Sequence, residues 1–212
     1  MKYKLVVFDM DGTILNTLSD LLSAVNYAME KSGYPQLNYD TLKGYVGNGI
    51  LKMLTRAVPK GIEDIEKVYA DFTEYYTEHC SDTTAPYEGI VEVIAKIKEL
   101  GYKTAVVSNK DDYGVKALCE QFFKGLFDIE IGVREGYEKK PAPDLVNIAF
   151  KYLKVEPCEA VYVGDSDVDF LTAKNSKTDF IGVEWGFRDR EVLEGLGAKN
   201  IASKPEDILR FL

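Results

Sequence analysis

The sequence contains a single histidine, His79, in 212 residues. Because it is the only histidine, a Ser-His-Asp triad, a His-rich metal site and the HExxH zinc motif are excluded, and we interpret His79 itself as a packing residue. The chain also lacks a GxGxxG segment after a strand-like run and lacks a GxxxxGK[ST] segment, so a dinucleotide-dependent redox enzyme and a P-loop NTPase are disfavoured. Any chemistry must therefore use carboxylates, hydroxyls and lysines.

Cysteine and long apolar runs are scarce as well. Cys80, Cys119 and Cys158 are odd in number, widely spaced and without a CxxC pair, which argues against a zinc knuckle or a redox pair. No stretch approaches the roughly 18 apolar residues of a membrane span, and the run Leu5 to Phe8 is too short for the core of a secretory signal. We expect a protein of the reducing cytoplasm with no membrane partner.

Positive charge is in deficit. The chain carries 26 Lys and Arg against 35 Asp and Glu, a net charge of −9, so nonspecific attraction to nucleic acid is not expected. A local group of donors could still bind a small anion. Apolar residues make up 46% of the chain and charged residues 29%, a composition that supplies enough material for a buried core.

The apolar pattern changes twice along the chain. Leu5 to Phe8 is a short apolar run that is typical of a strand buried on both faces. From about Thr17 to Cys80 the pattern is helical, with Gly33 as a predicted stop. Two stretches carry an apolar stripe at helical spacing: Leu18, Leu21, Leu22, Val25, Ala28 and Met29, and then Ile62, Ile65, Val68, Tyr69, Phe72 and Tyr76.

After Pro86 short strand-like runs alternate with helical stretches. The runs are Thr104–Val107, residues 129–133 and Ala160–Val163. This alternation predicts a doubly wound parallel sheet of the α/β class, covered by helices on both faces. We expect an α/β core of residues 1–15 and 87–212, with an all-helical domain of residues 16–86 inserted after the first strand.

Polar residues follow each predicted strand at its carboxyl end, which is where ligands bind in an open parallel sheet. Asp9, Asp11 and Gly12 follow the first strand. The other strands lead into Ser108-Asn109-Lys110, Lys139-Lys140-Pro141 and Gly164-Asp165-Ser166-Asp167-Val168-Asp169. Because the strands are parallel, all four sets are expected at one edge of the sheet.

These residue types fit phosphoryl transfer. The negative charges of Asp9 and Asp11 repel each other, so the pKa of one of the two carboxyl groups is raised. The ionised carboxylate can then act as a nucleophile, and the protonated carboxyl group can act as a proton donor. Carboxylate oxygens from Asp9 and from Asp165 or Asp169 suit Mg²⁺. Ser108 and Lys140 would supply a hydroxyl and a positive charge for the other phosphate oxygens.

Each segment taken alone also fits a structural role. A DxD pair after a strand is common as a turn or helix cap, and the Gly164 to Asp169 segment could cap a helix. Gly47-Asn48-Gly49 is typical of a turn, although its amides could face a ligand. The coincidence of four polar strand ends favours the functional interpretation.

In this order and spacing the residues resemble the haloacid dehalogenase superfamily of phosphatases. Its four motifs, DxDGT, S/T-N, K-P and GDxxxD, match segments that cover nearly the whole chain: Asp9 to Thr13, Ser108-Asn109, Lys140-Pro141 and Gly164 to Asp169. The helical insertion is similar to the family's small cap domain. Further segments are similar to phosphoglycolate phosphatases: Val46 to Gly49 with Arg56, Asn109-Lys110 and Trp185-Gly186.

The resemblance implies roles for individual residues. Asp9 would attack phosphorus to give an aspartyl phosphate, and Asp11 would protonate the leaving alcohol and then activate water. Ser108 and Lys140 would stabilise the transferring phosphoryl group. Mg²⁺ would be held by Asp9, the Asp11 backbone carbonyl and Asp165, with Asp169 as a further ligand or as the residue that orients Lys140.

The resemblance also implies substrate contacts and a substrate class. We expect contacts from the core residues Thr13 and Asn109 and from the cap residues Gly47, Asn48, Gly49 and Arg56, with Lys52 as a further candidate for the substrate carboxylate. The expected substrate is a small phosphorylated metabolite, with 2-phosphoglycolate as the first candidate, and the expected state is a monomer or homodimer.

Other functions fit parts of the pattern. Pyrophosphate, a nucleotide or a sugar phosphate could replace phosphoglycolate as the substrate, and a mutase or a phosphoacceptor receiver domain uses similar residues. Asp11 and the inserted helices argue against the receiver domain. In one departure from the family, Asn16-Thr17 stands where Asp-Thr or Asp-Ser is common, which is expected to affect the cap hinge more than the chemistry.

Overall fold

The chain divides into two compact units. The computed structural model describes residues 2–59 and 65–212. One unit comprises Met1–Leu15 with Pro86–Leu212, and the other comprises Asn16–Ala85. We call them the α/β unit and the helical unit.

The α/β unit is built on a six-stranded sheet in the order β5-β4-β1-β6-β7-β8, in which every neighbouring pair is parallel. The strands are β1 (Leu5–Phe8), β4 (Lys103–Asp111), β5 (Ile129–Val133), β6 (Ala160–Gly164), β7 (Asp179–Val183) and β8 (Asn200–Ala202). All residues of β1 and β6 are buried, as the sheet's central strands must be when helices cover both faces. These two strands place the loops that follow them at the middle of the sheet edge.

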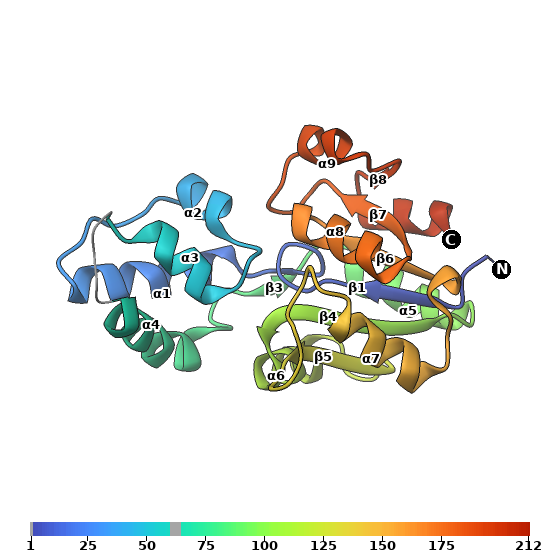
Figure 1. Ribbon diagram of the computed structural model, residues 1–212, viewed down its shortest axis with the longest axis horizontal. Helices are drawn as coiled ribbons and strands as arrows, with labels where there is room; N and C mark the ends of the chain where they lie inside the picture. The colour runs from blue at the N-terminus through green and yellow to red at the C-terminus, as the bar shows by residue number, and fades with distance from the viewer. Residues whose placement is uncertain (1, 60–64) are drawn as a thin grey trace. The chain divides into compact units, whose positions relative to one another are not determined.

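Helices cover both faces of this sheet (Figure 1). One apolar cluster joins alternate strand residues such as Val6 and Phe8 to α5, α6 and the 3₁₀ segment η2, and the other joins Leu5 and Val7 to α7 and α8. The helical elements of this unit are α5 (Ile90–Glu99), α6 (Asp112–Phe122), α7 (Asp144–Leu153), η1 (Pro157–Glu159), α8 (Asp167–Ser176), α9 (Arg190–Leu196) and η2 (Pro205–Phe211). The predicted doubly wound α/β sheet is confirmed.

The sheet extends beyond the predicted strands. β7 and β8 were not predicted from the sequence, because β7 contains a glycine and begins with a charged residue and β8 has three residues. Because both strands are parallel to the rest of the sheet, the chain returns to the site edge after β7 and again after β8. The return after β7 brings residues 185–188 into the site described below.

The helical unit contains α1 (Leu18–Lys31), α2 (Tyr39–Tyr45), α3 (Ile50–Ala57) and α4 (Ile65–His79). α1 buries the predicted apolar stripe except for Leu22, which is partly exposed, and Gly33 follows the helix with a φ of +70°. In the second predicted stripe, Ile62 lies outside the described residues, and the positions from Ile65 onward form α4. The two segments that connect the units form a small sheet of β2 (Leu15–Asn16) and β3 (Ala85–Pro86).

One buried carboxylate stabilises the base of the helical unit. Asp20, on α1, is 3% exposed. Its oxygens accept hydrogen bonds from the backbone N–H and the hydroxyl of both Thr83 and Thr84, at 2.5 to 3.1 Å. These contacts fasten α1 to the segment that returns to the α/β unit.

None of the helices in the described part of the chain has the length and apolar character needed to cross a membrane.

Candidate active site

Asp9 and Asp11 lie in the tight loop that follows β1. The Asp9 N–H donates to the Val163 carbonyl at 2.9 Å, which continues the pairing of β1 with β6. The chain then curls, and the N–H groups of Thr13, Ile14 and Leu15 all donate to the Met10 carbonyl. Both carboxylates are therefore held at the carboxyl edge of the sheet.

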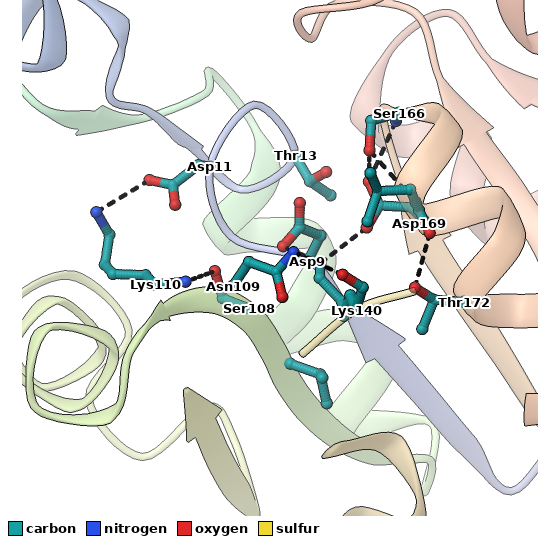
Figure 2. Close-up of polar contacts among 12 residues, drawn as sticks. Asp9, Asp11, Thr13, Ser108, Asn109, Lys110, Lys140, Ser166, Asp169 and Thr172 are labelled. Carbon is teal, nitrogen blue, oxygen red and sulfur yellow. Dashed lines mark hydrogen bonds and ion pairs between the residues drawn. The ribbon is translucent and has the colours of Figure 1, made fainter. Parts of the chain in front are cut away.

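Lys140 joins carboxylates that come from two different strand ends. Its Nζ donates to Asp9 Oδ1 at 2.6 Å, to Asp169 Oδ1 at 2.8 Å and to the Tyr162 hydroxyl at 3.0 Å. The Tyr162 hydroxyl itself donates to the Val107 carbonyl at 3.0 Å. Because an ammonium has three N–H donors, all three are used by these acceptors. Figure 2 shows Lys140 between Asp9 and Asp169.

Asp169 is fixed by the start of α8 as well as by Lys140. Ser166 is the N-cap of α8, and both its N–H and its hydroxyl donate to Asp169 Oδ2, at 3.1 and 2.6 Å. This is a capping box, in which the cap residue and the third helical residue satisfy each other. The predicted capping role of the Gly164 to Asp169 segment is therefore present together with its place in the site, because Asp169 Oδ1 faces Lys140.

Asp165 is held from two other loops. The Phe187 N–H donates to its Oδ2 at 2.6 Å, and the Thr13 hydroxyl donates to its Oδ1 at 3.4 Å. A Cβ on Gly12 would lie 2.4 Å from Asp165 Oδ2, and one on Gly186 would lie 2.3 Å from Asp165 Cβ. Since real Cβ atoms do not approach so closely, glycine is required where these loops surround Asp165.

The buried charges perturb one another strongly. Burial raises the pKa of Asp9 well above its usual range, and the charge of Asp169 raises it further, despite the opposing effect of Lys140. Burial and the charge of Asp169 likewise raise the pKa of Asp165 to about 7. Burial disfavours the charged form of Lys140, but Asp169 and Asp9 outweigh that effect and raise the pKa of Lys140.

This arrangement fits a divalent cation. Ligand oxygens of Asp9, Asp165 and Asp169 all lie within 4.8 Å of one another. When all three carboxylates are ionised, they and the ammonium of Lys140 carry two net negative charges, which a divalent cation would balance. The Asp11 carboxylate is not in this group, so any contact from Asp11 to the cation would come from its backbone carbonyl, as the resemblance implies.

Asp11 and Ser108 form a second part of the site. Asp11 Oδ1 lies 3.3 Å from the Nζ of Lys110. Ser108 is 2% exposed, and its hydroxyl oxygen accepts a hydrogen bond from the Lys110 N–H at 3.2 Å. In Figure 2 Asp11 and Lys110 lie on one side of Asp9, and Asp169 and Ser166 lie on the other.

The two predicted core contacts to substrate are engaged within the protein. The Asn109 side-chain amide donates to the Lys140 carbonyl at 3.1 Å, so Asn109 fixes the loop that carries Lys140. The Thr13 hydroxyl faces Asp165. Their predicted substrate contacts stay predictions, and the structure shows a positioning role for each.

The predicted cap residues lie together in the helical unit. Gly47 and Gly49 have φ values of +111° and +85°, and Gly49 is the N-cap of α3. Arg56 lies in the last turn of α3, and its guanidinium donates to the Tyr45 carbonyl at 2.9 Å. Gly47 to Gly49 form the predicted turn, and the substrate contacts of Asn48 and its neighbours stay predictions.

Several residues of the site were not predicted from the sequence. Tyr162 lies within an apolar strand, where its hydroxyl gave no local signal. Phe187 contributes a backbone N–H, and the side-chain N–H of Trp185 donates to the Thr13 carbonyl at 3.1 Å. Trp185 lies in the Trp185-Gly186 segment of the resemblance, which assigned it no role. It contacts the apolar core, and it also holds the loop that carries Asp9 and Asp11.

Comparison with known proteins finds a family that matches most of the chain. The model of the family described as haloacid dehalogenase-like hydrolase matches residues 6–183. A crystal structure of a candidate phosphoglycolate phosphatase from Lactobacillus delbrueckii superposes with a TM-score of 0.95 and 37% identity, and covers 98% of this chain and 97% of its own.

Two curated relatives carry different names. The phosphoglycolate phosphatase of Neisseria meningitidis is 30% identical, over 98% of this chain and 89% of its own length. A candidate pyrophosphatase of Caldanaerobacter subterraneus is 32% identical, over 92% of this chain and 87% of its own length. The similarity thus extends over nearly the full length of proteins named for two phosphate-containing substrates.

Proposed function

The chain belongs to the haloacid dehalogenase-like hydrolase family, and from this we propose that it is a phosphatase that releases phosphate from a small phosphorylated metabolite. The buried set of Asp9, Lys140, Asp169 and Asp165, with Asp11 on the same loop as Asp9, carries the proposal. The first candidate substrate is 2-phosphoglycolate, because the relative in Neisseria meningitidis is named for it.

Asp9 is the proposed nucleophile. Its Oδ1 is held by Lys140, which directs the carboxylate and leaves Oδ2 to attack phosphorus. The P–O bond to the alcohol breaks as the Asp9–phosphorus bond forms, and Asp11 donates its proton to the departing oxygen. Asp11 then takes a proton from the water that attacks phosphorus, which releases phosphate and restores Asp9.

Ser108 and Lys140 are proposed to stabilise the transferred group. The Ser108 oxygen accepts from the Lys110 N–H, so its own proton is available to a phosphoryl oxygen. Lys140 compensates part of the negative charge that Asp9, Asp169 and the phosphoryl group bring together. Such fixed charges act strongly in a buried site because they need no reorganisation during the reaction.

Mg²⁺ is the proposed cofactor, since phosphatases of this family generally use it. Asp9, Asp165 and the Asp11 carbonyl are its proposed ligands, and Asp169, whose oxygens accept from Lys140 and Ser166, is a further candidate. When bound, the cation would neutralise the phosphoryl oxygens and the carboxylates around them. The expected cytoplasmic location and the monomer or homodimer state stay predictions.

Pyrophosphate is the second candidate substrate, because the Caldanaerobacter relative is named as a candidate pyrophosphatase. A nucleotide or sugar phosphate fits the same chemistry. A phosphoacceptor receiver domain would retain the phosphate on Asp9, whereas the family assignment and the presence of Asp11 favour hydrolysis.

Phosphate release from a panel of substrates tests the proposal. The panel contains 2-phosphoglycolate, pyrophosphate, a nucleoside monophosphate and a hexose phosphate, each with Mg²⁺ and with EDTA. We expect turnover with Mg²⁺, loss of turnover with EDTA, and a fall of about 10⁴-fold or more in Asp9→Asn. Asp179→Asn is the matched control, because Asp179 begins β7 at the opposite edge of the sheet. Metal-independent turnover, or an active Asp9→Asn variant, would contradict the proposal.

A further inference from the structure

Lys110 is a buried cation that the proposed reaction does not use. It is near the carboxyl end of β4, and its side chain is 5% exposed. Lysine is rarely buried, because removing an ammonium from water is unfavourable unless negative charge compensates for it. Asp11 Oδ1, at 3.3 Å, supplies such a charge. A buried lysine beside the proposed acid and base therefore calls for an explanation.

The two buried lysines of the site differ in their surroundings. Lys140 contacts the proposed nucleophile Asp9, together with Asp169 and the Tyr162 hydroxyl. Lys110 faces Asp11 instead, on the other side of Asp9 (Figure 2). Lys140 thus compensates the carboxylates that hold the phosphoryl group and the cation, and Lys110 places a positive charge next to the proton donor.

Proximity to Asp11 places Lys110 on the leaving-group side. In the proposed function Asp11 must contact the ester oxygen in order to protonate it. In 2-phosphoglycolate a single methylene separates that oxygen from the carboxylate. A substrate bound with its ester oxygen at Asp11 therefore brings its carboxylate to the neighbourhood of the Lys110 ammonium.

We propose that Lys110 is a specificity-determining residue that binds a carboxylate carried by the leaving group. This inference rests on the proposed function, and it assigns the carboxylate a donor in the α/β unit in addition to the candidates of the helical unit. The substrate class it selects is a phosphate monoester with a carboxylate close to the ester oxygen. A charge-assisted hydrogen bond of this kind favours carboxylate-bearing esters by about 10- to 100-fold.

A pair of substrates tests the proposal on the unaltered protein first. Ethyl phosphate has the same chain as 2-phosphoglycolate, with a methyl group in place of the carboxylate. We expect kcat/KM for phosphoglycolate to exceed that for ethyl phosphate by at least about 10-fold, and glycolate to inhibit at a lower concentration than ethanol. Hydrolysis of both esters without this preference would overturn the role of Lys110 and leave the phosphatase function standing. Hydrolysis of no ester would contradict the proposed function itself.

Substitution of Lys110 then separates substrate binding from an effect through Asp11. In Lys110→Met we expect the loss of kcat/KM to be about 10- to 100-fold larger for phosphoglycolate than for ethyl phosphate, chiefly through KM, with part of the preference restored in Lys110→Arg. Lys124→Met, which removes the same charge from an exposed position of the same unit, should keep the wild-type preference. Equal losses on both esters would mean that Lys110 acts through Asp11, because both need a protonated leaving group, and would overturn the proposal.

Discussion

The two units bury carboxylates in opposite surroundings. In the helical unit, Asp20 is surrounded by neutral donors, the N–H and hydroxyl groups of Thr83 and Thr84. Burial alone would raise the pKa of Asp20, but these hydrogen bonds lower it. In the α/β unit, Asp9 lies among other carboxylates, and burial and Asp169 raise its pKa.

The difference separates a structural charge from a chemical one. Asp20 has its donors within the chain, so its ionised form stabilises the fold. Asp9 and Asp165 repel Asp169 and each other, and the α/β unit retains this unfavourable arrangement, which binding of a cation would relieve. Buried groups held in such an unfavourable state are typical of functional sites.

Of the substitutions that test this difference between the two units, replacement of Lys140 by methionine has the largest expected effect. Lys140→Met leaves Asp9 and Asp169 without their ammonium, and we expect kcat to fall by at least about 10³-fold. The measurement is kcat on the best substrate of the panel, with far-UV circular dichroism to verify folding. Lys139→Met is the control, because the neighbouring Lys139 is exposed. A folded Lys140→Met protein with wild-type kcat would show that the reaction at Asp9 does not need the positive charge of Lys140.

Tyr162→Phe tests the support beneath Lys140 with the loss of one oxygen atom. It removes the acceptor of one Lys140 N–H and the donor to the Val107 carbonyl. We expect the free energy of unfolding to fall by about 1–3 kcal/mol and kcat to fall about 10-fold, with KM less affected, because Lys140 loses its alignment. Tyr152→Phe, at an exposed tyrosine of α7, should change neither quantity. An unaltered kcat in Tyr162→Phe would restrict Tyr162 to a packing role.

Asp20→Asn tests the structural carboxylate of the helical unit. The amide keeps one acceptor oxygen but places its NH₂ group among the donors of Thr83 and Thr84. Urea titration should show a loss of about 1–3 kcal/mol in the free energy of unfolding. The effect on kcat should be smaller than that of Tyr162→Phe. If the loss of kcat, converted to a free energy, exceeded the loss in the free energy of unfolding, Asp20 would be coupled to the chemistry.

The pH dependence of that loss is the smallest expected effect. Because the folded-state pKa of Asp20 lies below the ordinary value of 3.8, its stabilising contribution is present above that value and is lost as the pH falls through the lowered pKa. The stability difference between wild type and Asp20→Asn should therefore be constant near neutral pH and narrow in acid. A difference that widens in acid would contradict the assigned direction.

The α/β sheet and the position of the site were predictable because they depend on local patterns. Apolar runs such as Leu5 to Phe8 and Ala160 to Val163 gave the central strands, and the parallel order of the strands placed their polar ends at one edge. The short strands β7 and β8 gave no such signal. Their absence from the prediction hid the loop that brings Phe187 to Asp165.

Contacts between distant residues could not be predicted. The bonds of Asp20 to Thr83 and Thr84 span more than sixty residues, and no periodicity links the three positions. The contact of Tyr162 with Lys140 depends on how the loop that carries Lys140 returns to the apolar strand β6. A tyrosine within an apolar strand favours the interpretation of simple core packing. The proximity of Lys110 to Asp11 likewise depends on how the loop after β1, which carries Asp11, folds.

The central claim, that Asp9 is a nucleophile and its surroundings serve phosphoryl transfer, is tested most directly by trapping the intermediate. Protein mixed with substrate and Mg²⁺ is quenched in acid during turnover, and its peptides are analysed by mass spectrometry. The account predicts a phosphoryl group on Asp9 that appears before inorganic phosphate and disappears when substrate is exhausted. Sustained turnover with no phosphoryl group on Asp9, or with the group on another residue, would contradict it.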